Sequence, residues 1–203
     1  MSNKRSHAVI IGGSVAGMCA ARAISDHFER VTIIERDRLP HDVRHRPGVP
    51  QGHHVHALLL RGLQELERLF PGFERTLTEH GARRIELGNE LAHCTEWGWA
   101  PRAVIGVEPM TVSRVLLESV LREHLRAAPR NIELIEETRT TGLMSVREGD
   151  RVRVTGVTTS RPELRELKAD LVIDAAGRSS KCLEWLQSRG VDRPEREVVD
   201  ALG

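Results

Sequence analysis

Two short apolar runs flank a helix-like segment near the start of the chain. Residues 8–11 and 31–34 are continuous and rich in β-branched side chains, a pattern typical of strands that are buried on both faces. Between them, after several glycines, residues 15–24 place Ala, Met and Ile at helical spacing. A strand–turn–helix–strand unit of about 30 residues has the size of one βαβ crossover. The pattern therefore predicts the beginning of a parallel α/β sheet.

The rest of the chain continues this alternation. Amphipathic helices are predicted over residues 58–70, 111–127 and 180–188, and strands over residues 132–135, 143–147, 152–158 and 171–173. Pro-Gly at 71–72 ends the first of these helices, and the Glu-Gly-Asp turn at 148–150 predicts a hairpin. Residues 82–110 differ, because short apolar pieces alternate with Gly, Pro and polar residues. We expect strands of a separate layer there, with Trp97 and Trp99 in its aromatic packing.

Composition narrows the class of protein. The 30 Lys and Arg balance 29 Asp and Glu, and only 3% of residues are aromatic, which argues against a nucleic-acid surface. No apolar run reaches the ~18–20 residues of a membrane span, and the polar N-terminus lacks a signal-peptide pattern. Cys19, Cys94 and Cys182 are widely separated and not at metal spacing. We therefore expect a globular cytoplasmic protein with no transmembrane segment and no nucleic-acid partner.

A glycine-rich turn lies between the first predicted strand and the first helix. It comprises Gly12, Gly13, Ser14, Val15, Ala16 and Gly17. In a dinucleotide fingerprint, Gly12 makes the tight turn and Gly17 lets the helix pack close to the sheet, while a diphosphate lies at the helix N-terminus. Ser14 replaces the usual middle glycine, and its hydroxyl can donate a hydrogen bond to a phosphate oxygen.

Glu35 ends the second predicted strand, about 20 residues after the turn, where fingerprints carry an acid. Its carboxylate could accept hydrogen bonds from both ribose hydroxyls of an adenosine, and it would repel a 2′-phosphate, which argues against NADP at this site. The alternative is that Glu35 is a solvated charge and the turn an ordinary loop. The dinucleotide interpretation requires that the protein's own groups leave the turn amides free, and it does not distinguish NAD from FAD.

Four segments resemble FAD-dependent monooxygenases and related oxidoreductases of the p-hydroxybenzoate hydroxylase fold, and they cover nearly the whole chain. They are the glycine turn with residues 35–37 (Glu-Arg-Asp), residues 46–52 (Arg-Pro-Gly-Val-Pro-Gln-Gly), residues 112–114 (Val-Ser-Arg) and residues 169–180. The last segment is similar to the family's Asp-Gly motif, G-A-D-G-R-x-S, but it has alanine where the family has aspartate. Asp174 is displaced from that place by two positions. An alternative for this segment is a buried strand and its exit turn.

The resemblance implies FAD as the cofactor. Besides the turn residues, the implied cofactor-binding residues are Glu35, Arg36, Arg46, Arg114, Asp174 and Gly177. Arg46 matches an arginine that contacts the cofactor, a role that suits a guanidinium, and its alternative is an ordinary exposed loop arginine. Arg114 lies at the unfavourable end of a helix dipole, which indicates an anionic partner, unless its stem only covers apolar surface.

The implied fold is α/β: a Rossmann-like FAD-binding parallel sheet with a β-meander insertion and part of a second β-sheet layer. Residues 1–81 and 111–190 would form two parts of the FAD-binding domain, with the meander at 139–160. Residues 82–110 would be partial substrate-domain strands, and residues 191–203 the start of a missing or truncated substrate domain.

The implied function is FAD-dependent oxidoreduction. The preferred hypothesis is a monooxygenase that uses NAD(P)H and O₂ to insert oxygen into a small organic substrate. The alternatives are a flavin-dependent reductase or dehydrogenase without oxygen insertion, and a truncated, non-catalytic fragment, because family members are considerably longer. No catalytic residue can be named. No metal site is predicted either, since His53, His54 and His56 have no carboxylate or cysteine at ligand spacing.

Overall fold

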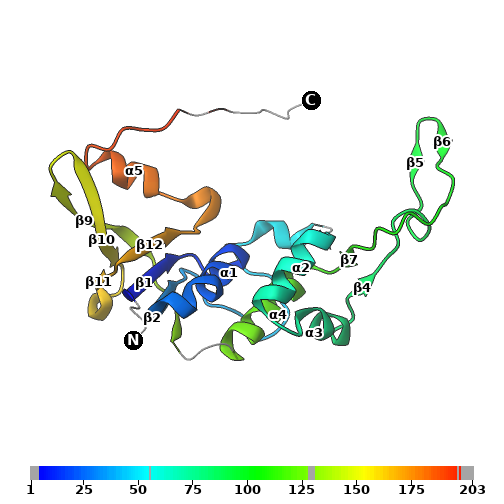
Figure 1. The fold of residues 1–203 in the computed structure, drawn as a ribbon, viewed down its shortest axis with the longest axis horizontal. Coiled ribbons are helices and arrows are strands. Elements are labelled where there is room, and N and C mark those ends of the chain that lie inside the picture. Colours follow the sequence, from blue (N-terminus) through cyan, green and yellow to red (C-terminus); the bar gives the residue numbers. More distant parts are fainter. Residues whose placement is uncertain (1–4, 55, 128–130, 196, 198–203) are drawn as a thin grey trace.

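A four-stranded parallel sheet forms the centre of the molecule (Figure 1). In this computed structural model, which describes residues 5–54, 56–127, 131–195 and 197, the strand order is β12-β1-β2-β8. The strands are β1 (Arg5–Ile11), β2 (Phe28–Ile34), β8 (Ile132–Ile135) and β12 (Leu171–Asp174). All three neighbouring pairs run parallel. The predicted parallel α/β sheet is confirmed, and its four strands include the four predicted runs.

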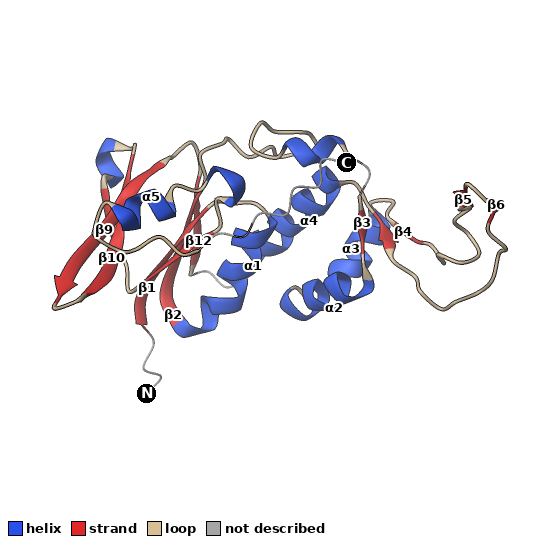
Figure 2. Ribbon diagram, turned by 90° about the horizontal axis from the view of Figure 1, so that it is seen from above, coloured by secondary structure: helices blue, strands red, loops and turns tan. Residues whose placement is uncertain are grey.

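The two faces of the sheet are covered by different layers. On β1, Ala8 and Ile10 face one hydrophobic cluster, whereas Val9 and Ile11 face another, as expected from the alternation of side chains along a strand. The first face is covered by α1 (Val15–Ile24), which packs directly on the strands, and α2 (Leu60–Leu69) and α4 (Arg114–Ala127) pack against α1 and extend the same hydrophobic cluster. The second face packs against an antiparallel sheet and α5 (Cys182–Gln187). Figure 2 shows the parallel sheet between these layers.

The antiparallel sheet is a meander of three strands in the order β11-β10-β9. They are β9 (Thr140–Glu148), β10 (Arg151–Thr159) and β11 (Glu166–Lys168). The predicted hairpin is present, and Gly149 takes the positive φ of +61° that its tight turn requires. The third strand was not predicted, because Glu-Leu-Lys is too short and too charged to give an apolar pattern.

Three predicted helices begin later than expected, and the one predicted over 180–188 is α5, which begins at Cys182. The predicted helix over 58–70 begins at Leu60, because Ala57–Leu58 form β3, and the predicted helix over 111–127 begins at Arg114, because Met110–Thr111 form β7. These strands pair with β4 (Arg83–Arg84) in a small sheet. A further helix, α3 (Phe73–Glu79), follows Pro71-Gly72 and was not predicted. Short 3₁₀ turns are η1 (Ser25–His27), η2 (Pro50–His53), η3 (Pro162–Leu164) and η4 (Gly177–Ser179).

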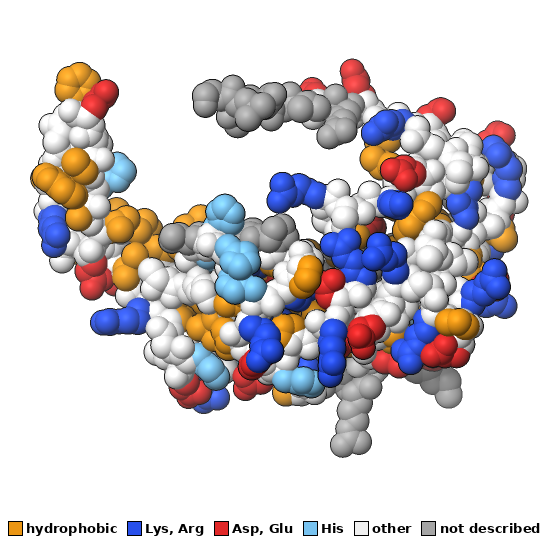
Figure 3. All heavy atoms as spheres, turned by 180° about the vertical axis from the view of Figure 1, so that it is seen from behind, with side chains coloured by type: hydrophobic (Ala, Val, Ile, Leu, Met, Phe, Trp, Pro, Cys, Tyr) orange, Lys and Arg blue, Asp and Glu red, His pale blue; other side chains and the backbone are white. Residues whose placement is uncertain are grey.

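Residues 85–109 form an arm that leaves the body (Figure 1, right). Its only strands among the described residues are β5 (Cys94–Thr95) and β6 (Gly98–Trp99), which pair as a short hairpin. The expected aromatic packing is wrong: Trp97 is 90% and Trp99 72% exposed, because no other part of the described chain covers the hairpin. Figure 3 shows hydrophobic side chains along this arm. The expected start of a further domain at 191–203 lies mostly outside the described residues.

Candidate functional site

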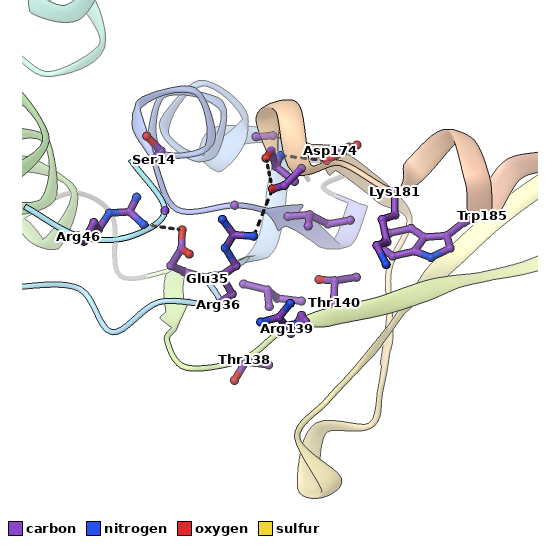
Figure 4. Close-up of a pocket in the computed structure, with 17 residues that line it drawn as sticks. Ser14, Glu35, Arg36, Arg46, Thr138, Arg139, Thr140, Asp174, Lys181 and Trp185 are labelled. Atoms are coloured by element: carbon purple, nitrogen blue, oxygen red, sulfur yellow. Dashed lines mark hydrogen bonds and ion pairs between the residues drawn. The ribbon is translucent and has the colours of Figure 1, made fainter. Parts of the chain in front are cut away.

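A cleft of about 760 Å³, including space open to solvent, lies at the carboxyl ends of β1, β2 and β12 (Figure 4). Open parallel sheets bind ligands at this edge, where the connecting loops diverge. The loops after the three strands line the cleft, together with the loop at Arg46 and Gly48, the segment 138–140 that follows β8, and residues at the start of α5. Residues far apart in sequence are therefore brought to one edge.

The glycine turn has the geometry expected of Gly12 and Gly17. Gly12 has φ +103°, and a Cβ there would lie 2.5 Å from the carbonyl oxygen of Ala175. A Cβ on Gly17 would lie 1.8 Å from the carbonyl oxygen of Gly12. The first turn of α1 follows, and its early amides, including those of Val15 and Ala16, have no intrahelical acceptors. The turn thus presents a helix N-terminus beside the cleft.

Glu35 lies at the turn but is already hydrogen-bonded. Its Oε2 accepts from the Gly13 amide at 2.7 Å, and its Oε1 accepts from the Asp37 amide at 3.0 Å. The alternative of a solvated strand-end charge is wrong, because the residue is only 5% exposed. The requirement that the turn amides be free is met only in part. The Gly13 amide is occupied by Glu35 itself, so the first-turn amides of α1 are the donors left for an anion.

Arg46 is the most enclosed cation of the cleft. Its side chain is 5% exposed, whereas that of Arg44 in the same loop is 70% exposed, so the alternative of an ordinary exposed arginine is wrong. Its Nη1 lies 2.8 Å from Asp37 and 3.5 Å from Glu35. Burial acts to lower the pKa of Arg46, but the surrounding carboxylates hold that pKa above its usual value. The Nη2 atom is buried and has no hydrogen-bond partner within the described chain.

A buried carboxylate that the sequence did not single out, Glu118 of α4, joins this group. It accepts from Arg46 Nε at 3.3 Å and from Arg114 Nη2 at 3.3 Å. The anionic partner expected for Arg114 is therefore present, as Glu118. Ser14 also donates its hydroxyl hydrogen to Glu118, at 2.5 Å. The prediction that the Ser14 hydroxyl donates to a phosphate is not supported, because Glu118 already accepts its hydrogen.

The opposite end of the cleft is more open. Arg36 Nη1 lies 3.4 Å from the hydroxyl of Ser179. Asp174 lines the cleft, and its carboxylate accepts from the Ala176 amide at 3.0 Å and from the Ser180 hydroxyl. Gly177 begins η4 with φ +64° and does not line the cleft itself. The displaced aspartate therefore shapes the turn that follows β12.

Eleven of the twelve predicted residues fall into three groups, and Gly177 lies apart from them in the turn after β12. Six of them line the cleft: Gly12, Ser14, Glu35, Arg36, Arg46 and Asp174. The turn behind them holds Gly13, Val15, Ala16 and Gly17, while Arg114 reaches the turn through Ser14. Sequence reasoning missed the lining residues Thr138, Arg139, Thr140, Lys181 and Trp185. The signal was available, because segments that follow neighbouring parallel strands meet at one edge, and residues 181 and 185 share a helix face.

Two further observations concern metals and membranes. The described ranges contain no group of three or more His, Cys, Asp or Glu that could hold a metal ion. The rings of His53 and His45 stack, with centroids 3.8 Å apart. Among the described residues, no helix is both long and apolar enough to cross a bilayer.

Comparison with known proteins adds to this geometry. No family model matches the chain. Protein Rv3254 of Mycobacterium tuberculosis is 35% identical over 215 residues, a match that covers 98% of this chain but 44% of the relative. The chain therefore spans less than half the length of this curated relative.

Solved structures of similar shape include PqsL, described as a probable FAD-dependent monooxygenase from Pseudomonas aeruginosa (TM-score 0.60, 18% identity, 95% of this chain and 48% of that one). 2-Methyl-3-hydroxypyridine-5-carboxylic acid oxygenase is also similar (TM-score 0.62, 19% identity, 91% and 42%). A third is a Diels-Alderase of pyrroindomycin biosynthesis (TM-score 0.60, 19% identity, 89% and 34%). The chain therefore has the fold of FAD-dependent monooxygenases, over somewhat less than half of their length.

Proposed function

We propose that this chain is the FAD-binding part of a flavin-dependent monooxygenase that acts on a small organic substrate with NAD(P)H and O₂. Bound FAD would supply the redox chemistry, accepting a hydride and activating oxygen, while the protein binds it, orients it and excludes water. The observation that carries the proposal is the Nη2 of Arg46. This buried guanidinium nitrogen lacks a partner and belongs to a residue that lines the cleft beside the glycine turn.

The residues present fit a dinucleotide cofactor. The first-turn amides of α1 and the spare nitrogen of Arg46 are donors suited to a diphosphate. A carboxylate can accept about four hydrogen bonds, and Glu35 uses only two of these positions on the Gly13 and Asp37 amides, so it retains capacity for ribose hydroxyls. As part of the same proposal, we assign Arg36 and Asp174, which line the cleft, to the adenosine end of the cofactor, and Gly177 to the turn that shapes this end.

The test compares two arginines of one loop. Arg46→Gln should weaken FAD binding about tenfold or more, because a charge-assisted contact to the diphosphate is lost. Arg44→Gln, which changes an exposed side chain paired with exposed Asp42, should alter the affinity less than about twofold. Binding is followed by the visible absorbance and fluorescence of added FAD, with far-ultraviolet circular dichroism to verify folding. A wild-type chain that does not retain FAD, or equal losses in both folded variants, contradicts the proposal.

A second candidate is a flavin-binding protein without oxygen insertion, either a reductase or dehydrogenase or a non-catalytic fragment. One observation favours keeping it, namely the similarity of the fold to a Diels-Alderase. One fold can host unrelated reactions, so the shape alone does not choose. Measuring O₂ consumption together with H₂O₂ release by the FAD-loaded chain, with NAD(P)H and trial organic substrates, separates the candidates. A reductase returns the consumed O₂ as H₂O₂, a non-catalytic chain consumes none, and the monooxygenase proposal expects O₂ consumption that exceeds H₂O₂ release, because one oxygen atom enters the substrate and the other leaves as water.

A further inference from the structure

Glu118 of α4 is a buried carboxylate on which several donors of the candidate site converge. It is 3% exposed. Its Oε1 accepts from the Ser14 hydroxyl at 2.5 Å and from Arg114 Nη2 at 3.3 Å, and its Oε2 accepts from Arg46 Nε at 3.3 Å. Arg122 Nη1 lies 3.8 Å away. One carboxylate therefore fixes side chains from the glycine turn, the Arg46 loop and α4.

The buried arginines around Glu118 need its negative charge to balance their positive charges. Arg122 is as deeply buried as Glu118, which is its only acidic partner within 4 Å in the described ranges. Burial lowers the pKa of Arg122, and nearby Arg46 and Arg126 lower it further, while Glu118 acts in the opposite direction. Without Glu118, three guanidinium groups would lie close together with a buried charge left unpaired. We expect them to repel one another and to lose their fixed positions.

The arginines held by Glu118 still have unused donors. Arg46 Nη2 and Arg114 Nε are buried and lack partners in the described part of the chain. Glu118 thus satisfies one side of each guanidinium and leaves another nitrogen available. Buried donors of this kind are costly unless something accepts from them, so the unpaired Nη2 of Arg46, whose side chain lines the cleft, points to an anionic ligand there.

Ser14, the residue that departs from the usual glycine fingerprint, is part of the same group of contacts around Glu118. Ser14 stands where the middle glycine is expected, and a serine adds a polar side chain at the point of approach to a diphosphate. Here that side chain is turned to Glu118 and also accepts from Arg114 at 3.2 Å. The hydroxyl is therefore held by α4.

We propose that Glu118 is a positioning residue for the cofactor diphosphate. It holds Ser14, Arg46 and Arg114 beside the start of α1, so that the unused Nη2 of Arg46, the one of these two arginines that lines the cleft, meets the diphosphate. This inference rests on the proposed function, because it assumes that a dinucleotide occupies the cleft.

The test measures binding of ADP, which carries the diphosphate, and of adenosine, which does not, by calorimetry or by displacement of FAD. Glu118→Gln should weaken ADP binding about tenfold, the size of a lost charge-assisted contact, and leave adenosine binding unchanged. The matched control is Glu86→Gln. Glu86 is another buried carboxylate, which accepts the amides of Ile105 and Gly106 at the base of the arm, and its substitution should leave both affinities unchanged.

Ser14→Ala provides a milder variant that keeps the test decisive if Glu118→Gln does not fold. It should weaken ADP binding about threefold, since it removes one neutral donor from Glu118, and it should leave adenosine binding unchanged. Adding Ser14→Ala to Glu118→Gln should cause little further loss, because both changes break one arrangement.

The outcomes that would contradict this inference differ from those that would contradict the proposed function. ADP affinity that is unchanged or tighter in folded Glu118→Gln overturns the inference, and so does an equal loss for ADP and adenosine, which indicates a merely structural role. In both cases wild-type FAD binding would leave the proposed function standing. A wild-type chain that binds neither FAD nor ADP overturns the proposed function and this inference together.

Discussion

The parallel sheet and the arm at residues 85–109 use apolar side chains in opposite ways. In the sheet, Ala8, Val9 and Ile10 are fully buried, because layers formed by the same chain cover both faces. In the arm, Trp97 and Trp99 are mostly exposed. The comparison teaches that an apolar pattern predicts burial only where the chain supplies a neighbour. It also separates the molecule into a region that sets the geometry of the cleft and one that should not affect it.

The arm is held mainly at its base. The carboxylate of Glu86 accepts the amides of Asn89, Ile105 and Gly106, at 2.7, 2.7 and 2.9 Å. Beyond this point the hairpin has no neighbour among the described residues apart from its own strands. Changes beyond the base should therefore leave the sheet and the cleft as they are, and each experiment below pairs one change in the sheet region with one in the arm.

The largest effect is expected from Gly17→Ala. Alanine favours helices, but its Cβ would lie 1.8 Å from the Gly12 carbonyl oxygen, so α1 must move away from the sheet. We expect the free energy of unfolding to fall by at least about 2 kcal/mol. Trp97→Ala in the arm should change it by less than about 0.5 kcal/mol. Urea denaturation followed by circular dichroism measures both. A tolerated Gly17→Ala would show that α1 does not pack as closely as described.

A smaller effect is expected on the stability of the protein at acidic pH. His7 of β1 is buried, with Nε2 2.8 Å from Thr32 Oγ1 and Nδ1 2.6 Å from the Lys168 carbonyl oxygen. Burial lowers the pKa of His7 below its ordinary value of 6.5. The unfolded chain therefore binds a proton more readily than the folded chain. The stability from neutral His7 is complete above about pH 6.5 and is lost as the pH falls through the lower folded pKa.

The measurement is the urea concentration at the midpoint of unfolding, determined at several pH values between 5 and 8. His7→Gln should reduce the loss of stability on acidification, although His56, whose pKa is also lowered by burial, will retain part of it. His93→Gln, in the exposed arm, should leave the pH dependence unchanged. An equal pH dependence in wild type and His7→Gln would remove His7 as a source of acid sensitivity.

The mildest probe is thiol alkylation, because it begins with the unaltered protein. Burial raises the pKa of Cys19 in α1 to about 11, from an ordinary 9.0, so its thiolate is about a hundredfold scarcer near neutral pH. Cys94 lies exposed in the arm. With iodoacetamide at pH 8, we expect Cys94 to react first and Cys19 last, with Cys182, whose pKa burial also raises, between them. Mass spectrometry gives the order, and early modification of Cys19 would indicate that α1 opens.

The sequence predicted the elements whose side-chain period is regular. The runs at 8–11 and 31–34 and the helix over 15–24 are read directly, because buried strands and amphipathic helices have distinct periods. β11 was not predicted, since it depends on pairing with β10 and has no apolar pattern of its own. Helix α3 was missed because it begins directly after a Pro-Gly turn that was interpreted only as an end.

In the candidate site, too, some residues could be predicted from the sequence and others could not. Gly12, Gly17 and Glu35 follow from a local motif, and the structure places them at the cleft or behind it. Their role in binding a cofactor stays a prediction. Glu118 could not be predicted, because its importance arises where α4 meets the glycine turn about a hundred residues earlier. No spacing rule connects these two positions.

The hydrogen bond between Ser14 and Glu118 has an evolutionary consequence. The serine hydroxyl has an acceptor only if α4 carries one, and the carboxylate loses one donor if glycine replaces the serine. Selection should therefore act on the two positions as a pair. Among descendants of a common ancestor, glycine at the first position should coincide with relaxed identity at the second, and serine with a retained acid.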